Sequence, residues 1–320
     1  MSRDPASLYD ALSGVARGTV ERSFPLSRFT TYRLGGPAEI YVEPADLDDL
    51  VAIAAQLRSL DPRGEIPVLI VGRGSNMIVS DEGWPGLAVR LGQPFASLHS
   101  SRHDPSSFDA GAGKPLPLVA NWSARRALAG MEWGVGVPGS IGGAVRMNAG
   151  AHGADLAASL VHATILDIDT GEITERSGDR LRLRYRHSNL ADREIVISAR
   201  LKLTPEPQEV IRSRMDSFRK HRAATQPGAL QNAGSTFKNP EGDSAGRLVE
   251  AAGLKGWRVG GASVSELHAN FFMADDTATA QDVFDLIHDV RRKVNDAFGV
   301  ELTPEVRFVG PFAEAEVKRA

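Results

Sequence analysis

The chain has 320 residues and carries 37 Lys and Arg against 40 Asp and Glu, a net charge of −3. This balance excludes the broad positive field of a nucleic-acid-binding surface. The lack of cysteine excludes disulfides, thiolate catalysis and Cys-based zinc or iron–sulfur sites. No apolar run reaches the roughly 18 residues of a membrane span, and the polar N-terminus MSRDPASLYD does not read as a secretory signal. We therefore expect a cytoplasmic globular protein with no metal site and no affinity for nucleic acid or membrane.

The first 80 residues are expected to form a small α/β unit. Glu39–Val42 alternates in polarity as a strand does, and Asp46 suits the N-cap of a helix whose apolar side chains recur at helical spacing. Val68–Val71 is a short apolar run typical of a buried strand, and it leads into the glycine-rich loop Gly72–Asn76. A loop at the carboxyl end of such a strand is where open α/β sheets bind ligands.

Strands dominate the region from Leu87 to Thr204. Thr170-Gly171 has the composition of a hairpin turn between two of them, and one helix, Leu116–Ala129, interrupts them and stops at Gly130. The expected strands are Leu87–Leu91, Val161–Asp167, Glu172–Glu175 and Ile195–Leu203. This mixture indicates an α+β region.

A glycine-rich stretch, Gly134–Gly153, lies within this region and has seven glycines in its twenty residues. Glycine lets the backbone approach a ligand closely, and successive bare N–H groups form a concavity that suits phosphate oxygens. The letters Gly134-x-Gly136-x-x-Gly139 satisfy the dinucleotide fingerprint, but that fingerprint needs a strand before it, and here a helix is expected upstream. The stretch therefore predicts a cofactor loop of another kind, with a tight surface connection as the alternative.

The C-terminal third is expected to begin with a helix over residues 206–223 that links to a further domain. A long amphipathic helix is predicted from the cap Thr279, with Asp282 three residues on, as far as Gly299. The other expected elements are a short helix at Gly246–Ala252 and strands at His268–Met273 and Glu305–Val309.

Three further segments carry polar side chains suited to chemistry. The arginine of Tyr185-Arg186-His187-Ser188 is either a functional cation or a solvated surface charge. In Ala233–Pro240, Ser235 follows a glycine, but the second glycine of a nucleophile elbow is missing, so a turn serine is the simpler interpretation. In Thr303–Arg307, Glu305 and the arginine two residues on share one face of a strand, where a surface ion pair is the common use.

Taken together, these segments resemble one family, the UDP-N-acetylenolpyruvoylglucosamine reductases. The resemblance runs in register from Thr30 to Gly310. The motifs that carry it are TTYRLGGPA, VGRGSN, GVPGSIGGAVRMNAGAHG, YRHS, AGSTFKNP, AGLKGWRVGGASVSELHANFF and LTPEVRFVG. Seven motifs in order are far more specific than any one of them.

The resemblance implies an α+β fold, with a two-lobed FAD-binding module of the p-cresol methylhydroxylase type followed by a C-terminal α/β substrate domain. The implied bounds are 1–80 and 81–205 for the two lobes and 206–320 for the substrate domain, whose last strand returns to the active site. FAD would be held non-covalently. The residues implied to line it are Gly72, Gly74, Ser75, Asn76, Pro138, Gly139, Ser140, Gly142, Gly143 and Asn148.

The family's reaction completes UDP-N-acetylmuramate for peptidoglycan in two halves. NADPH reduces FAD and leaves; UDP-N-acetylglucosamine enolpyruvate then binds, and flavin N5 delivers a hydride to its vinyl carbon C3. Arg186 and Glu305 match the residues that stabilise the resulting enediolate, Glu305 through a proton because a bare carboxylate would repel the charge. Ser235 matches the residue that protonates C2. The implied partners are therefore NADPH and the enolpyruvyl sugar.

The substrate side of the site departs from one branch of the family. YRHS is followed almost directly by the strand Ile195–Leu203, so the chain resembles the short-loop branch, which lacks a tyrosine-bearing insertion over the substrate. The basic cluster 219–222 either meets the UDP diphosphate or is a solvated helix face. The residues expected to bind the substrate are Arg219, Arg222, Lys238 and Asn239.

Two other functions compete with this one. An oxidase of the same FAD-binding superfamily would often tether its flavin through His or Cys; cysteine is absent, and His152 is the only histidine near the glycine stretch. A non-catalytic nucleotide-sugar sensor would keep the fold without the chemistry. The presence of Arg186, Ser235 and Glu305 speaks against the sensor.

Overall fold

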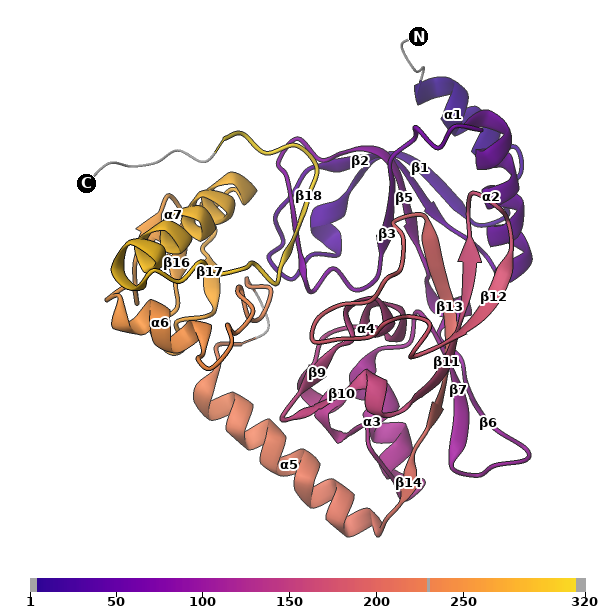
Figure 1. Cartoon of the computed structure of the whole chain (residues 1–320). Helices are drawn as coiled ribbons and strands as arrows, with labels where there is room; N and C mark the ends of the chain where they lie inside the picture. The colour runs from indigo at the N-terminus through magenta and orange to yellow at the C-terminus, as the bar shows by residue number, and fades with distance from the viewer. Residues whose placement is uncertain (1–4, 229–230, 315–320) are drawn as a thin grey trace. The chain divides into compact units, whose positions relative to one another are not determined.

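The computed structural model describes residues 5–228 and 231–314, which pack into two compact units (Figure 1). Unit 1 comprises the described residues up to Ser23 together with 39–73 and 86–221. Unit 2 comprises 24–38, 74–85 and the described residues from Arg222 onward. The two units are interleaved in sequence, and the division into three domains at residues 80 and 205 stays a prediction.

Most of the first sheet belongs to unit 1, with strand order β1-β2-β5-β3. Its strands are β1 (Thr19–Pro25), β2 (Pro37–Glu43), β5 (Trp84–Arg90) and β3 (Val68–Val71). Strands β3 and β5 are parallel. Helix α2 (Leu47–Leu60) begins at Asp46, whose side chain accepts a hydrogen bond from the Asp49 amide. The predicted order of strand, capped helix, strand and glycine loop is confirmed. Helix α1 (Pro5–Ser13) packs on α2.

The second sheet of unit 1 is antiparallel, with strand order β12-β11-β13-β7-β6. Its strands are β12 (Ile173–Ser177), β11 (Leu160–Asp167), β13 (Glu194–Lys202), β7 (Ser107–Gly111) and β6 (Leu98–Ser100). The predicted turn at Thr170-Gly171 joins β11 to β12, and Gly171 has a φ of +78°. A single hydrophobic core connects this sheet with α2 and with the fully buried Phe108 and Trp133.

The predicted helix Leu116–Ala129 is too long. Helix α3 is Leu116–Ala124, because Ala127 takes a left-handed conformation with a φ of +57° that ends the helical path. The next two residues, β8 (Leu128–Ala129), pair instead with β14 (Thr204–Pro205). The apolar residues keep their helical spacing beyond Ala124, where α3 ends. The pairing of β8 with the distant strand β14 determines the structure of the residues that follow.

The glycine stretch contains elements that the sequence did not reveal. A short 3-10 helix, Glu132–Gly136, packs against α3, and helix α4 (Ile141–Met147) is capped by the Ser140 hydroxyl. The two-residue strands β9 (Gly150–Ala151) and β10 (Ala154–Asp155) follow as a tight hairpin. Glycine-rich composition masked these elements, because glycine has the weakest intrinsic preference for a helix among residues other than proline.

Helix α5 (Gln208–Thr225) buries Ile211 and Met215 on one side, against Ala124 and Ala129. Within unit 1, Arg214 also holds the helix in place, because its guanidinium contacts Glu132 at 2.7 Å and Glu206 at 2.5 Å. This confirms the helix predicted over residues 206–223.

Unit 2 contains the antiparallel sheet β15-β16-β17 and two helices. The elements are β15 (Arg258–Val259), β16 (Ala262–Val264), β17 (Phe272–Ala274), α6 (Ala245–Ala251) and α7 (Ala280–Phe298). A separate parallel pair joins β4 (Met77–Val79) to β18 (Arg307–Val309). Both predicted strands, His268–Met273 and Glu305–Val309, are shorter than expected, so Glu305 precedes β18 and is not part of it.

Helix α7 has the predicted ends. Thr279 and Asp282 form a capping box, and Gly299 ends the helix with a φ of +67°. The carboxylate of Asp81 also accepts hydrogen bonds from the amides of Ala280 and Gln281, at 3.0 and 3.1 Å. An anion at this position is stabilised by the helix dipole.

The capping box yields a stability prediction. Thr279→Ala removes the side-chain oxygen that accepts from the Asp282 amide and should lower the free energy of unfolding by about 1 kcal/mol. Thr279→Ser keeps that oxygen and should stay within a few tenths of a kcal/mol of wild type, as measured by denaturant titration. Equal stability of the two variants would contradict a capping role for the hydroxyl.

Candidate functional site

The two glycine-rich loops predicted separately from the sequence meet within unit 1. The Arg73 Nε atom donates to the Pro138 carbonyl oxygen at 3.2 Å. A Cβ atom on Gly72 would lie 2.9 Å from the Ser140 hydroxyl oxygen, so a side chain at this position would displace that hydroxyl. Two segments far apart in sequence therefore contribute to one surface.

Bare backbone donors are present in both loops. Among the residues that the structure describes, the N–H groups of Gly139 and Ser140 in unit 1 have no acceptor. The same holds for Gly74 and Ser75 in unit 2, within the described part of the chain. Unpaired amides at a glycine-rich loop suit the oxygens of a phosphate group, and the Gly139 and Ser140 amides of unit 1 therefore suit a cofactor that carries phosphate groups.

The glycines of these loops serve different purposes. Gly74 has a φ of +61°, and a Cβ there would lie 2.4 Å from the Phe29 carbonyl oxygen, so packing inside unit 2 requires this glycine. A Cβ on Gly142 would lie 3.1 Å from that of Ala112, again a packing constraint. Gly143 is exposed, and a Cβ there would meet only the Ser140 hydroxyl oxygen, at 3.6 Å. Packing within the protein does not explain Gly143.

Asn148 is a structural clamp in unit 1. It ends α4 in the left-handed conformation, with a φ of +40°, and is buried. Its Nδ2 atom donates to the Asp155 carboxylate at 2.9 Å and to the Arg184 carbonyl at 3.1 Å, while its Oδ1 atom accepts from the Ala157 amide at 2.9 Å. Protein groups engage both ends of the side-chain amide, so any contact of this residue with a cofactor falls to its backbone.

Arg186 lies at the tip of a tight turn, next to the glycine stretch. The backbone groups of Arg184 and His187 pair with each other on either side of the tip, and Arg186 has a φ of +53°. Its guanidinium donates to the Gly150 carbonyl at 2.9 Å and lies 4.9 Å from the centre of the Tyr185 ring. Unit 1 thus brings Arg186 and the predicted cofactor loop together.

In unit 2, Ser235 and Glu305 come from segments that pair along their backbones. The Glu305 amide donates to the Thr236 carbonyl at 2.7 Å, and Phe237 bridges to Pro304. Ser235 and Glu305 are both half-buried. The side-chain amide of Asn76 donates to the Glu305 carbonyl at 3.1 Å, so Asn76, predicted to line FAD, also supports Glu305.

Sequence reasoning missed Asn270, which is buried and holds the Ser235 segment. Its Oδ1 atom accepts from the Phe237 amide and its Nδ2 atom donates to the Phe237 carbonyl, each at 2.9 Å. Its own carbonyl accepts from the Thr236 amide at 2.8 Å. The side-chain amide of Asn270 therefore pairs with the Phe237 backbone as the backbone of a neighbouring strand would. The sequence signal for this role was a polar asparagine between an alanine and two phenylalanines in the segment HANFF.

The predicted substrate residues have different surroundings. In unit 1, Arg219 pairs with Asp216 at 2.7 Å and with the Asn121 side-chain oxygen at 3.2 Å, so its guanidinium has protein partners. In unit 2, Arg222 is half-buried, and desolvation lowers the pKa of its guanidinium. Lys238 donates its amide to the Thr303 carbonyl, and the side-chain oxygen of Asn239 accepts from the Ala245 amide at 3.1 Å.

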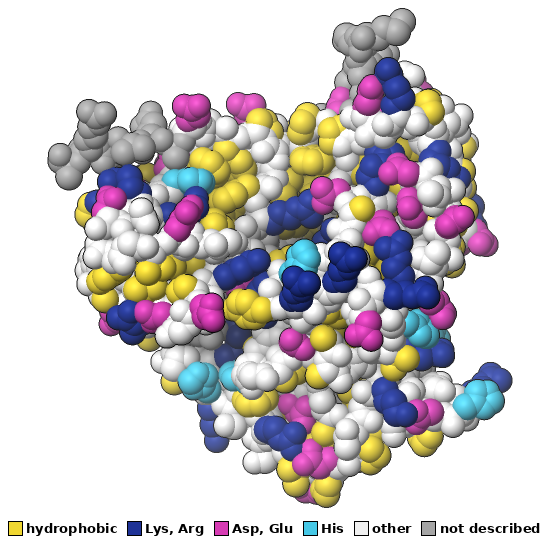
Figure 2. All heavy atoms as spheres, viewed as in Figure 1, with side chains coloured by type: hydrophobic (Ala, Val, Ile, Leu, Met, Phe, Trp, Pro, Cys, Tyr) yellow, Lys and Arg dark blue, Asp and Glu magenta, His cyan; other side chains and the backbone are white. Residues whose placement is uncertain are grey.

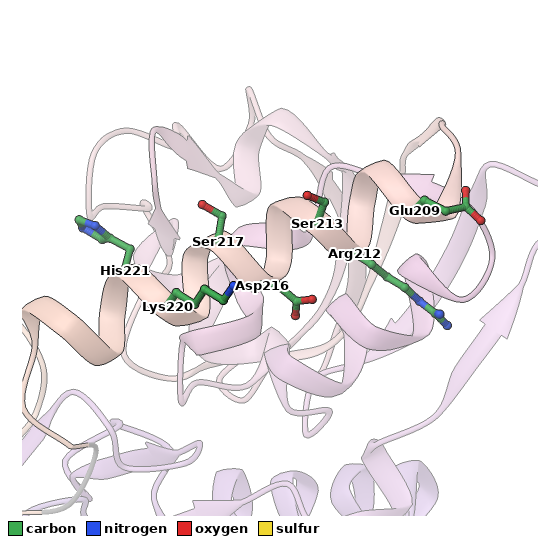
Figure 3. Close-up of a pocket in the computed structure, with 7 residues that line it drawn as sticks. All are labelled: Glu209, Arg212, Ser213, Asp216, Ser217, Lys220 and His221. Atoms are coloured by element: carbon green, nitrogen blue, oxygen red, sulfur yellow. The ribbon is translucent and has the colours of Figure 1, made fainter.

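A pocket of about 710 Å³ lies along α5 (Figure 3). Figure 3 shows that all of its lining side chains rise from this one helix. They are Glu209, Arg212, Ser213, Asp216, Ser217, Lys220 and His221. Acidic and basic groups alternate in this lining, which contains none of the predicted catalytic or cofactor residues. The pocket is therefore not the predicted site.

The described residues hold no second site of another kind that the charge, metal or membrane patterns indicate. Figure 2 shows basic and acidic side chains on the same visible face, in line with the near balance of charge. No group of His, Asp or Glu among the described residues is arranged to hold a metal ion. In residues 5–228 and 231–314, no helix is both long and apolar enough to cross a membrane.

Comparisons with known proteins match both parts of the chain. Residues 38–177 match the FAD binding domain, and residues 226–309 match the C-terminal domain of UDP-N-acetylenolpyruvoylglucosamine reductase. The reductase of that name from Synechococcus sp. (strain RCC307) is 42% identical over 306 residues, covering 94% of this chain and 97% of the relative. That from Acidiphilium cryptum (strain JF-5) is 43% identical over 294 residues, covering 92% of each.

Among solved structures, the crystal structure of the reductase from Thermus caldophilus aligns with a TM-score of 0.74 at 34% identity, covering 92% of this chain and 99% of that one. With the domain matches, this confirms the predicted order of an FAD-binding module followed by a C-terminal domain of the reductase.

Gly143 yields a prediction about FAD. Gly143→Ala adds a methyl group that the protein accommodates, and in a helix it should leave the FAD-free protein as stable or up to roughly 1 kcal/mol more stable. If FAD passes over this residue, the dissociation constant of FAD should rise about tenfold or more, a loss of about 1.4 kcal/mol. Thermal unfolding and flavin-fluorescence titration measure the two quantities.

Gly178→Ala is the matched control, because Gly178 belongs to neither loop and a Cβ there meets only Leu183, at 3.8 Å. It should leave FAD affinity unchanged. Wild-type FAD affinity in Gly143→Ala would remove Gly143 from the cofactor site.

Proposed function

The chain belongs to the UDP-N-acetylenolpyruvoylglucosamine reductase family, and on this premise we propose that it reduces UDP-N-acetylglucosamine enolpyruvate to UDP-N-acetylmuramate with NADPH. It is an FAD-dependent oxidoreductase of peptidoglycan precursor synthesis. The observation that supports the proposed mechanism is the backbone pairing of the Ser235 and Glu305 segments in unit 2, two residues from distant parts of the chain that we propose as proton donor and stabilising group.

FAD is held without a covalent bond in this proposal. The chemistry that FAD supplies when bound is the transfer of a hydride from NADPH, through flavin N5, to the vinyl carbon C3 of the enolpyruvyl group. The backbone of Gly72 and of 138–143 contributes from unit 1, and that of 74–76 from unit 2. A covalent tether is disfavoured, because cysteine is absent and the ring of His152 is stacked face to face on Phe218, with centroids 4.0 Å apart.

Arg186 stabilises the negative charge that develops when C3 is reduced. That charge lies at C2 and spreads into the adjacent carboxylate as an enediolate. A guanidinium stays protonated at any working pH and presents several donors in a fixed plane, which suits a carboxylate. Arg186 is half-buried, and its guanidinium is held by the Gly150 carbonyl. The guanidinium is therefore oriented before the reaction, and little free energy is spent on reorganising it in the transition state.

Ser235 and Glu305 complete the reduction. Ser235 donates its proton to C2, because a carbanion-like centre is more basic than an alkoxide, and the serine is then reprotonated by its surroundings. Glu305 donates a hydrogen bond to the enediolate through its own proton, since a bare carboxylate would repel the charge. Hydride at C3 and proton at C2 together account for the reduction of the double bond.

The substrate diphosphate is proposed to contact Arg222, Lys238 and Asn239 in unit 2. Arg219 belongs to unit 1 and already has Asp216 and Asn121 as partners, so its contribution would require the exchange of those contacts. Cytoplasmic location is part of the same proposal, because the reaction consumes NADPH.

Ser235→Ala separates the two halves of the reaction. Proton donation belongs only to the second half, so NADPH should reduce the flavin at close to the wild-type rate. Reoxidation by the enolpyruvyl sugar should slow by about 10²-fold or more. Stopped-flow absorbance of the flavin follows each half in turn.

Ser263→Ala, a serine of β16 in the same unit, is the control and should behave as wild type in both halves. Equal slowing of both halves in Ser235→Ala would assign Ser235 to the fold or to flavin binding. No slowing in either half would mean that another group supplies the proton.

Glu305→Gln tests the stabilisation of the enediolate. The amide keeps the shape and one donor but loses the acidic proton, so turnover should fall roughly 10²- to 10³-fold. Glu301→Gln is the matched control, because Glu301 is an exposed partner of Arg291 in the same unit. Steady-state NADPH oxidation in the presence of the enolpyruvyl sugar measures both variants. Wild-type turnover in Glu305→Gln would return Glu305 to a surface role.

A further inference from the structure

The turn that carries Arg186 is strained and depends on its neighbours. Arg186 has a φ of +53°, a conformation that costs a side chain with a Cβ atom free energy and persists only where surrounding contacts impose it. The Arg184 and His187 backbones pair across the base of the turn at 3.1 Å in both directions. These two bonds close the turn, but they do not fix where the turn lies in unit 1.

The C-terminal end of α4 fixes that position from two sides. The hydroxyl of Ser188, just after the turn, donates to the Arg146 carbonyl at 2.7 Å. On the other side, Asn148 donates to the Arg184 carbonyl at 3.1 Å, the same oxygen that accepts from the His187 amide. Asn148 is 1% exposed, so water does not compete for this bond.

Asn148 also fixes the group that holds the Arg186 guanidinium. Its second donated bond goes to the carboxylate of Asp155. The backbone of Asp155 lies opposite Gly150 in the β9–β10 hairpin. The Gly150 carbonyl accepts from Arg186 at 2.9 Å. One buried amide thus connects the backbone of the turn with the hairpin that receives the guanidinium at its tip.

We propose that Asn148 is a positioning residue for Arg186, through its bonds to the Arg184 carbonyl and the Asp155 carboxylate. The proposal rests on the proposed function of Arg186 in the second half-reaction. A helix end alone requires only a residue that tolerates a positive φ, as glycine does. The side-chain amide therefore serves the turn and the hairpin in addition to the end of α4.

Asn148→Gly separates these two uses, because glycine keeps the left-handed helix end and removes the amide. Reoxidation of reduced flavin by the enolpyruvyl sugar should slow about 10²-fold, as expected for a misplacement of about 1 Å. Reduction by NADPH should stay at the wild-type rate. Hydrogen exchange of the holoenzyme, followed by mass spectrometry, should show faster exchange in the peptide that covers residues 184–190.

Val145→Ala is the matched control, because it weakens the packing of α4 in the core and leaves all bonds of Asn148 in place. Its exchange over residues 184–190 and its reoxidation rate should stay near wild type. Equal exchange in Asn148→Gly and Val145→Ala, or equal slowing of both half-reactions in Asn148→Gly, overturns the proposal.

A double variant tests whether Asn148 acts through Arg186. In an Arg186→Ala background, Asn148→Gly should slow reoxidation no further, because the group it positions is gone. Additive slowing overturns the proposal. If Arg186→Ala alone leaves reoxidation unchanged, the proposed function of Arg186 fails, and the positioning inference for catalysis fails with it. If Arg186→Ala slows reoxidation and Asn148→Gly does not, only the positioning inference fails.

Discussion

Buried backbone polar groups need hydrogen-bond partners, and in the irregular segments of this protein asparagine side chains supply several of them. Asn148 in unit 1 satisfies the Arg184 carbonyl and the Ala157 amide. Asn270 in unit 2 satisfies both backbone groups of Phe237. Neither segment belongs to a regular sheet, so these side-chain amides supply hydrogen bonds that a neighbouring strand would otherwise provide. The segments of Arg186 and Ser235 are thereby ordered without a helix or strand to carry them.

The same requirement for hydrogen-bond partners is left unmet at the proposed cofactor surface. The amides of Gly139 and Ser140 have no acceptor among the described residues of unit 1, whereas nearby Ile141 and Gly142 donate to Lys114 and Ala112. When the amides on one side of a loop are paired and the next ones are not, the unpaired amides are donors that the oxygens of a ligand can satisfy. The pyrophosphate of FAD fits such a loop, and this agrees with the match of residues 38–177 to an FAD-binding domain.

Elements with strong local signals were predictable from the sequence. Helix α7 has a capping box at its start, apolar residues at helical spacing and a glycine at its end, and its predicted bounds are confirmed. Strand β3 is a continuous apolar run, and its four residues are as predicted. By contrast, α3 ends before its apolar pattern does, and β18 begins after Glu305, because pairing with other segments set those ends.

By itself, the sequence determined the glycine loops, the capped helices and the ordered motifs that identify the family, since each depends on residues close together in the chain. Tertiary structure alone decided which glycines are needed for packing, such as Gly74 against Phe29, and which have room for a Cβ atom, such as Gly143. It also decided that Glu305 joins the Ser235 segment and that Asn148 connects the Arg186 turn with the β9–β10 hairpin. Hydrogen bonds between distant segments have no periodicity along the chain, and for that physical reason the sequence could not reveal them.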